Sequence, residues 1–269
     1  MADMRLLSWN VQWCRGMDGR VDPKRIAAEA RKAEPDVFCV QEIARNFPEM
    51  AGSAGEDQVE VLRREMPGYE AFFVSAIDLP GKNGRRRFGN LVLSRLPAGR
   101  VLRHMLPWPA AQVQSMQRAA LEVVVEAPFG PLRVMTTHLE YYSKEHRGAQ
   151  IDRLHALHAE ACAPHLPVTE PGSYESFDRA KTALLCGDFN LPPTDSHHQK
   201  MLDGGFTDAW QALNPGKPRQ ATFHLFDGET PYCCDYIFVT PDLVPRLKSM
   251  RIDAQTQASD HQPVVLELA

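Results

Sequence analysis

Short apolar runs recur along the whole chain, and many of them are rich in β-branched residues. Each run is bounded by Gly, Pro, Asp or Asn, which is typical of buried strands separated by turns. The pattern therefore predicts a protein built largely on buried strands. The predicted strands cover residues 4–8, 37–41, 71–74, 90–93, 121–126, 132–137, 183–186, 236–239 and 263–268.

Helical patterns occupy several of the segments between these runs. Residues 23–34 follow Asp22, a favourable N-cap, and open with Pro23, which suits the first helical position. Residues 56–66 and 144–162 also have helical periodicity. Residues 164–179 are rich in Pro, Gly, Ser and charge, and we interpret them as a surface insertion. Strands with helices between some of them favour a single mixed α/β domain over residues 1–269.

Carboxylate, amide and imidazole side chains stand where several of the predicted strands begin or end. Glu42 follows the run 37–41, His138 follows the run 132–137, and Asp188 lies just beyond the run 183–186. Polar groups at strand ends gather at one rim of a layered sheet, where loops build sites on a rigid scaffold. We therefore predict one shared site. Its candidate residues are Asn10, Glu42, His138, Asp188, Asn190, Asp235, Asp260 and His261.

The residue types in this set indicate metal and phosphate chemistry. An oxygen-rich group of Glu, Asp and Asn side chains suits a hard cation such as Mg²⁺ or Mn²⁺. The sequence has no cysteine or multi-histidine set with zinc spacing, which argues against zinc. Imidazoles beside carboxylates suit charge stabilisation on a phosphoryl group. A single Asp or Asn after a strand is commonly a turn former, so the prediction depends on the whole set.

The charge balance limits the kind of partner that we expect. The chain has 30 Lys and Arg against 34 Asp and Glu, a net charge of −4. Long, tight, non-specific binding of nucleic acid is therefore disfavoured, although a nuclease is not excluded. The one concentrated basic run is Arg85-Arg86-Arg87, which is either a grip for a phosphate backbone or a solvated loop tip.

The sequence also bears on location and on several isolated residues. No apolar stretch approaches the length of a membrane span, the start does not resemble a secretory signal, and the six scattered cysteines suggest reduced thiols in a cytoplasmic protein.

Trp108, between two prolines, is either a stacking platform for a base or an anchor for its loop. We interpret four further histidines as surface residues. They are His155, His158, His197 and His198.

The segments that carry the candidate residues resemble the endonuclease/exonuclease/phosphatase superfamily, which has the DNase-I-like fold. They occur in the order known for that family and extend from residue 8 to residue 264. The segments GDFN and SDHQP are fairly specific to this family, and the complete set in this order is strongly specific to it. The matching segments are SWNVQ, VFCVQE, FGNLVLSR, TTHLE, GDFN, CDYIFV and SDHQPV.

The resemblance implies a fold and a first group of site residues. The fold would be a four-layer sandwich in which two mixed β-sheets pack face to face with helices outside. Glu42 would be the main metal ligand, with Asn10 beside it, and Asp260 would support the metal or the base network. The cofactor would be Mg²⁺ or Mn²⁺, and the substrate would be a phosphoester.

The resemblance also implies catalytic and substrate-binding roles. Asp188 would orient or deprotonate the attacking water, and Asn190 would steady that water and the phosphate. His261, oriented by Asp235, would contact the phosphate as a base or as a stabiliser, and His138 would stabilise the transition state. The residues expected to bind phosphate or substrate are Arg118, Asn90 and Arg147, with an ordinary solvated arginine as the alternative for Arg118.

The branch of the family, and hence the substrate, stays open at this point. Ile43-Ala44-Arg45 after Glu42 departs from the abasic-site endonucleases, which have Thr and Lys there, and residues 231–236 match the inositol phosphatases only in part. THLE followed by Arg147 and Gln150 is more similar to the tyrosyl-DNA-phosphodiesterase and general bacterial branch. We predict a nuclease or a DNA-repair-type phosphodiesterase. The alternatives are a phosphatase or phosphodiesterase of small or lipid phosphoesters, and a binding module without catalysis.

Overall fold

Side chains along the strands alternate between two faces, and both faces are covered. In β1 (Met4–Asn10), Leu6 lies in the core between two sheets, whereas its neighbour Leu7 lies in a second core beneath helices. In β8 (Ala183–Asp188), Leu184 and Leu185 are divided in the same way. Strands that are buried on both faces have nearly continuous apolar sequences, which explains the runs found in the sequence.

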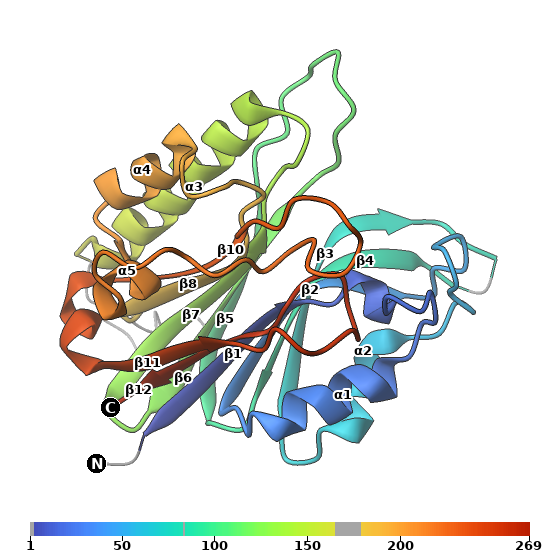
Figure 1. The fold of residues 1–269 in the computed structure, drawn as a ribbon, viewed down its shortest axis with the longest axis horizontal. Coiled ribbons are helices and arrows are strands. Elements are labelled where there is room, and N and C mark those ends of the chain that lie inside the picture. The colour runs from blue at the N-terminus through green and yellow to red at the C-terminus, as the bar shows by residue number, and fades with distance from the viewer. Residues whose placement is uncertain (1–2, 83, 165–178) are drawn as a thin grey trace, which may run out of the picture.

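Two mixed sheets form the centre of the structure, a computed structural model that describes residues 3–82, 84–164 and 179–269 (Figure 1). In each sheet one pair of neighbouring strands is parallel, β1 with β2 and β7 with β8, and the other pairs are antiparallel. The first sheet has the order β11 (Leu247–Ile252), β12 (Val264–Leu268), β1, β2 (Val37–Arg45), β4 (Arg86–Ser94) and β3 (Glu70–Leu79). The second has the order β5 (Ala98–Met105), β6 (Ala119–Ala127), β7 (Gly130–His138), β8, β10 (Asp235–Val239) and β9 (Thr207–Asp208).

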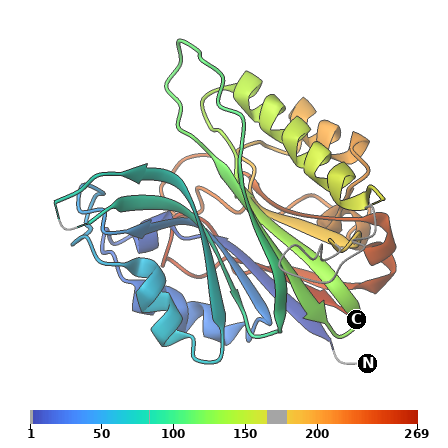
Figure 2. The ribbon, with the colours of Figure 1, turned by 180° about the vertical axis from the view of Figure 1, so that it is seen from behind.

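Helices cover the outer faces of the two sheets. The helices α1 (Pro23–Lys32) and α2 (Gln58–Glu65) pack on the first sheet, and α3 (Lys144–Cys162) and α4 (Ser196–Asp203) pack on the second. Figure 2 shows the same two helical layers from behind. The short elements are α5 (Ala209–Leu213) and the 3-10 helices η1 (Gln12–Cys14) and η2 (Pro241–Arg246). The predicted four-layer DNase-I-like arrangement is confirmed.

The strand register brings the predicted polar residues to one end of the sheets. Met4, at the start of β1, pairs with Leu268 near the C-terminus, so β1 runs away from both termini (Figure 1). At the far ends of β7 and β8, His138 pairs with Asp188, and the antiparallel β10 begins with Asp235 opposite Asp188. The site therefore forms at the end of the sheets remote from the termini.

Every strand predicted from an apolar run is present, and three further strands are not among those predictions. These three are β5, β9 and β11, and each is at the edge of its sheet. Edge strands expose one side to solvent, and both β5 and β11 alternate between partly buried and exposed residues. Their weak apolar pattern is the reason that the sequence did not reveal them.

The predicted helices are also present, with ends shifted by one or two residues for two of them. Asp22 caps α1, because its side chain accepts hydrogen bonds from the backbone N–H of Lys24 and Arg25. The short helices α4 and α5 were not predicted. Most of the proposed insertion 164–179 lies outside the described residues. In the described part of the chain, no helix has the length and apolar character needed to cross a membrane.

Several interpretations of isolated residues change in the structure. His198 is not a surface residue but is 4% exposed, and its Nε2 lies 2.8 Å from the Asp208 carboxylate. His155, His158 and His197 are partly buried and not freely solvated. Trp108 is 51% exposed, and its indole N–H donates to Ser115 within the same loop, residues 106–118. All six cysteines are free, as predicted.

Candidate active site

Glu42 reaches the site because β2 contains a β-bulge. The pairing of β2 with β4 changes register between Val40 and Ile43, and Glu42 has a positive φ of 58°. The sequence predicted that this strand ends at residue 41, but the strand continues to Arg45 beyond the bulge. Bulges commonly redirect a side chain next to an active site. Here the bulge places a partly exposed carboxylate within a largely buried strand.

The GDFN segment turns sharply at the end of β8. Gly187 is required there, because a Cβ atom at this position would lie 1.9 Å from the carbonyl oxygen of Thr137. The backbone N–H of Asn190 donates to Asp188 Oδ1 at 2.9 Å and closes the turn. The Asn190 side-chain amide then donates to His138 Nε2 and to the Leu139 carbonyl, both at 2.8 Å. The turn thus joins Asp188, Asn190 and His138.

Asn10 links the two sheets at the base of the site. Its Nδ2 donates to Glu42 Oε1 at 3.1 Å and to Asp188 Oδ2 at 3.0 Å. Its Oδ1 accepts a hydrogen bond from the backbone N–H of Gln12 at 3.1 Å. Because Asn10 is fully buried, its amide holds two carboxylates from different sheets at a fixed separation.

His138 lies between the two carboxylates that Asn10 joins. Its Nδ1 is 3.7 Å from Glu42 Oε1, and its Nε2 is 3.5 Å from Asp188 Oδ2. Burial lowers the pKa of His138 well below its usual range, and the positive charge of Arg118 adds to this effect. A neutral ring is consistent with Asn190, which donates to Nε2 and leaves the ring proton on Nδ1.

His261 is held in the opposite protonation state. Its Nδ1 is 2.9 Å from Asp235 Oδ2, as the family resemblance implied. Burial lowers the pKa of His261, but the charges of Asp235 and Asp188 outweigh this and raise the pKa to about 10. Phe223 stacks on the ring at 4.4 Å between centroids, and Trp9 donates to the His261 carbonyl. The site therefore contains one neutral and one cationic imidazole.

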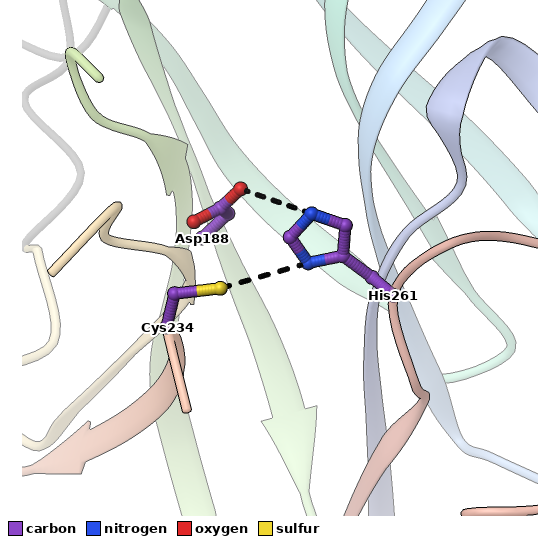
Figure 3. Close-up of side chains that lie close together, drawn as sticks. All are labelled: Asp188, Cys234 and His261. Carbon is purple, nitrogen blue, oxygen red and sulfur yellow. Dashed lines mark hydrogen bonds and ion pairs between the residues drawn. The ribbon is translucent and has the colours of Figure 1, made fainter. Parts of the chain in front are cut away.

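Cys234 also lies against His261. Figure 3 shows the thiol and the Asp188 carboxylate near different nitrogens of the imidazole, at 3.8 Å from Nδ1 and 3.7 Å from Nε2. Burial, followed by the negative charges of Asp235 and Asp188, raises the pKa of Cys234 well above its usual range. Asp235 already occupies Nδ1. This trio is therefore poorly suited to bind a metal through a thiolate.

A second group suits a divalent cation better. Ligand atoms of Glu42, His138 and Asp188 all lie within 4.8 Å of one another. Burial and the neighbouring charge of Asp260 raise the pKa of Glu42 to about 7, and burial raises the pKa of Asp188 to about 6. Buried carboxylates that are costly to ionise are the kind of ligand that a cation would stabilise. Of the predicted metal ligands, Glu42 is in this group, whereas Asn10 and Asp260 lie beside it.

These groups form the floor of a cleft of about 370 Å³. Apolar and aromatic side chains line the rest of its wall, among them Trp13, Met50, Tyr141 and Tyr142. A few polar groups in a mostly apolar cleft is the usual composition of a small-molecule site. A cavity of about 380 Å³ lies elsewhere, next to Arg25 and Asp253, and contains none of the predicted site residues.

The three predicted phosphate-binding residues are placed differently. Arg118 lines the cleft and is 5% exposed, and its Nε lies 3.6 Å from the Glu140 carboxylate. Asn90 donates to the Ala119 carbonyl at 2.9 Å and supports the strand that follows Arg118. Arg147 is not in the cleft wall, because its Nη1 donates to the carbonyls of Glu140 and Tyr141. Only Arg118 of the three lines the cleft.

Two features of the site were not predicted. Gln12 donates from Nε2 to Asp260 Oδ2 at 2.6 Å and lines the cleft. Tyr141 and Tyr142 lie at its rim, 50% and 54% exposed. Gln12 was within the SWNVQ segment, and the tyrosines directly follow THLE, so the neighbouring motifs were the only available signal.

Two acidic residues partly offset the charge of the basic run ahead of the site. Arg85 and Arg87 both contact the Asp78 carboxylate, at 2.5 and 3.3 Å, and Arg86 contacts Glu49 at 2.6 Å. These guanidinium groups are therefore less available to grip a phosphate backbone.

Comparisons with known proteins agree with this geometry. The model of the endonuclease/exonuclease/phosphatase family matches residues 7–261. An endonuclease/exonuclease/phosphatase from Beutenbergia cavernae is 25% identical, with a TM-score of 0.76, over 100% of this chain and 72% of that chain. No curated protein matches the sequence.

Two further solved structures share the fold at lower identity. A mannosyl-6-phosphatase from Bacteroides thetaiotaomicron is 20% identical, with a TM-score of 0.73, over 99% of both chains. D. rerio TDP2, complexed with a single-strand DNA product, is 19% identical, with a TM-score of 0.68, over 100% of both chains. At this identity the similarity concerns the fold.

Proposed function

The chain belongs to the endonuclease/exonuclease/phosphatase family, whose members are generally phosphoesterases, and from this premise we propose that it is a Mg²⁺- or Mn²⁺-dependent phosphoester hydrolase. One observation carries the proposal. Glu42, His138, Asp188 and His261 come from separate segments of both sheets and form one continuous chain of contacts, each between 3.5 and 3.7 Å, in a single cleft.

The side chains are arranged for in-line attack of water on phosphorus. Asp188 would accept a proton from the attacking water, since burial holds its pKa near 6, close to the working pH of a general base. Asn190 would orient that water. Glu42 would be the main ligand of the cation, near Asp188 and His138, and the cation would supply positive charge for a phosphate oxygen and acidify water.

The cationic groups would stabilise the charge that develops on the phosphate. His261 carries a positive charge that Asp235 fixes in place, which supports the stabilising role over the role of a base. Arg118 lines the cleft and would bind a phosphate oxygen through its guanidinium group. His138 is neutral and hydrogen-bonded to Asn190, and it would contact the phosphate as an uncharged imidazole.

We propose a nucleic acid as the first candidate substrate, as for a nuclease or DNA-repair-type phosphodiesterase. The similarity to D. rerio TDP2, solved with a single-strand DNA product, supports this choice. A hydrolase of small phosphoesters is the second candidate. The acidic partners of Arg85, Arg86 and Arg87 favour it, because they lower the positive charge that the one basic run offers to a backbone. The assembled site favours catalysis over a silent binding module. The cytoplasmic location stays a prediction.

The proposal is tested by an activity assay with and without metal. Purified protein is assayed with Mg²⁺, Mn²⁺ or EDTA against bis-(p-nitrophenyl) phosphate, p-nitrophenyl phosphate, and single- and double-stranded oligonucleotides. We expect metal-dependent turnover that Asp188→Asn lowers by at least about two orders of magnitude, because the general base is lost. The matched control is Asp152→Asn, a carboxylate 64% exposed on α3, which should keep full activity. Turnover that persists in EDTA, or in Asp188→Asn, would contradict the proposal.

A further inference from the structure

The cleft has a charged floor but aromatic and apolar walls. Trp13 and Met50 follow β1 and β2 of the first sheet, whereas Tyr141 and Tyr142 follow β7 of the second. Phosphate chemistry needs only the floor. A phosphate carrying only small polar groups would leave these walls without a partner, so the walls indicate an apolar, flat part of the substrate.

The backbone of Tyr141 and Tyr142, which form one wall of the cleft, is held in place although their rings are exposed. Arg147, buried in α3, donates to the carbonyls of Glu140 at 2.8 Å and Tyr141 at 3.2 Å. Gln150 accepts from the backbone N–H of Glu140, and the Glu140 carboxylate accepts from the N–H of Tyr142, both at 2.9 Å. A buried guanidinium and a buried carboxylate thus fix the backbone of two half-exposed aromatic residues. A backbone that is ordered before binding reduces the entropy lost when these side chains bind a partner.

The opposite wall is fixed in a similar way. Gln12, Trp13 and Cys14 have positive φ values of 45°, 43° and 63°, which force a tight left-handed turn. Gln58 donates to the Trp13 carbonyl at 2.7 Å, and the Trp13 indole N–H donates to Ala51 at 3.0 Å. The turn thus holds the Trp13 ring in the cleft lining.

The charges limit how much of a substrate is recognised. Arg118 is the only lysine or arginine among the described residues that line the cleft. Arg85 and Arg87 share the Asp78 carboxylate, and Arg86 is paired with Glu49. A cleft of about 370 Å³ is near the lower end of the range for ligand sites. These features fit one phosphate and one attached group, and they do not fit a backbone bound along several phosphates.

We propose that the cleft recognises a phosphoester through one planar aromatic group, of the size of a nucleobase, which contacts Tyr141 and Tyr142 while the phosphate lies on the charged floor. This inference rests on the proposed function for the identity of the floor. The planar group belongs either to the end of a nucleic-acid strand or to a free small phosphoester, and recognition extends over that single unit.

The first test is a binding measurement that does not depend on turnover. Calorimetry compares thymidine 5′-phosphate with 2-deoxyribose 5-phosphate, which lacks only the base, in the presence of Mg²⁺. We expect the base to tighten binding by about tenfold, within the range of a base stacked on aromatic side chains. The double variant Tyr141→Ala/Tyr142→Ala should bring the two affinities within about twofold of each other, whereas Tyr141→Phe/Tyr142→Phe should keep the preference.

The outcomes separate this inference from the proposed function. Equal affinities in the wild-type protein, or a preference that survives in a folded double alanine variant, would overturn the inference. A base preference without metal-dependent turnover of any phosphoester would leave the inference standing and sink the proposed function. Circular dichroism of both double variants checks that they fold.

The second test compares a mononucleotide with short and long single-stranded oligonucleotides as the salt concentration rises. If one unit is recognised, affinity changes little with length, and the logarithm of affinity falls with a slope of about −0.7 per decade of salt, as for one phosphate contact. A slope several times steeper, with much tighter binding of long strands, would show a backbone track and overturn the inference.

Discussion

Gln12 supports the site although it is not one of the charged residues at the floor of the cleft. Its amide donates to Asp260 at 2.6 Å, and its backbone N–H donates to Asn10. Asp260 in turn raises the pKa of Glu42 through its charge. Gln12 therefore orients one carboxylate of a crowded group and is best described as a positioning residue.

Replacing this amide should reduce activity more than stability. We expect Gln12→Met to lower kcat/KM about tenfold, because a hydrogen bond to a charged group typically contributes about 1.5–3 kcal/mol. The side chain is only partly buried, so unfolding should change little. Steady-state kinetics and urea denaturation measure the two effects. An unchanged kcat/KM would mean that Ser259, the other side chain bound to Asp260, is sufficient to orient it.

The arginines show why residue identity did not predict function at every position. Arg118 and Arg147 were both predicted to bind phosphate, and both are buried. What differs is their position: Arg118 lines the cleft, whereas Arg147 does not line it and donates through Nη1 to backbone carbonyls. Because the direction of a guanidinium depends on the surrounding backbone, the sequence could not separate them.

A polar network packs between the second sheet and α3, away from the catalytic cleft. Glu122 of β6 accepts from Arg179 through both carboxylate oxygens, at 2.8 and 2.6 Å, and lies 3.8 Å from Arg133 of β7. Burial raises the pKa of Glu122, but the hydrogen bonds of His104 and Arg179 and the charge of Arg133 outweigh it and lower the pKa to about 2. The ionised carboxylate therefore stabilises the layer.

Neutralising Glu122 should destabilise the protein in a pH-dependent way. At neutral pH we expect Glu122→Gln to lower the free energy of unfolding by about 3 kcal/mol, because two arginines lose their buried partner. The folded pKa is lower than that of the unfolded chain, so the stabilisation is complete above about pH 4.5 and is lost as the pH falls towards about 2. The difference between variant and wild type should shrink over that interval.

Urea denaturation at several pH values measures this difference. Glu126→Gln is the control, because Glu126 is an exposed residue of the same strand. A gap between Glu122→Gln and wild type that stays constant down to about pH 2 would contradict the assigned role of Glu122.

The bulge in β2 is a second feature at the level of an element. An alternating or continuous apolar run predicts a strand but does not reveal an extra residue within it. The apolar run therefore predicts a strand over 37–41, whereas the strand continues to Arg45. The bulge depends on pairing with β4, a strand far away in the sequence.

The candidate metal group spans the contact between the two sheets. Glu42 belongs to the first sheet, and His138 and Asp188 belong to the second. A bound cation would therefore connect the two halves of the sandwich and also offset the crowding of their carboxylates.

This arrangement predicts that the metal stabilises the fold. Mn²⁺ or Mg²⁺ at about a hundred times its Kd should add about 2.7 kcal/mol to the free energy of unfolding, if it binds only the folded chain. Thermal unfolding with increasing metal concentration measures the effect as a rise in Tm. Glu42→Gln should lose the rise, and Asp152→Asn should keep it. A Tm that is independent of metal in the wild-type protein would contradict the assignment of Glu42, His138 and Asp188.

The predicted strands, the helices α1, α2 and α3 and the motif residues could be derived from the sequence, because buried strands and capped helices have local patterns. The resemblance of the ordered motifs also indicated the four layers. The edge strands β5 and β11 could not be derived because exposure weakens the apolar pattern, and β9 could not be derived because it has only two residues. The single-domain organisation stays a prediction.

The composition of the site follows from the sequence, but its electrostatics follow from the packing of the two sheets. His138 and His261 are the same residue type with similar burial, yet one is neutral and the other is cationic. Their difference arises from partners distant in the chain: Arg118 near His138, and Asp235 and Asp188 around His261. Charge interactions act over a few ångströms of space, and only the folded chain brings these groups within that distance.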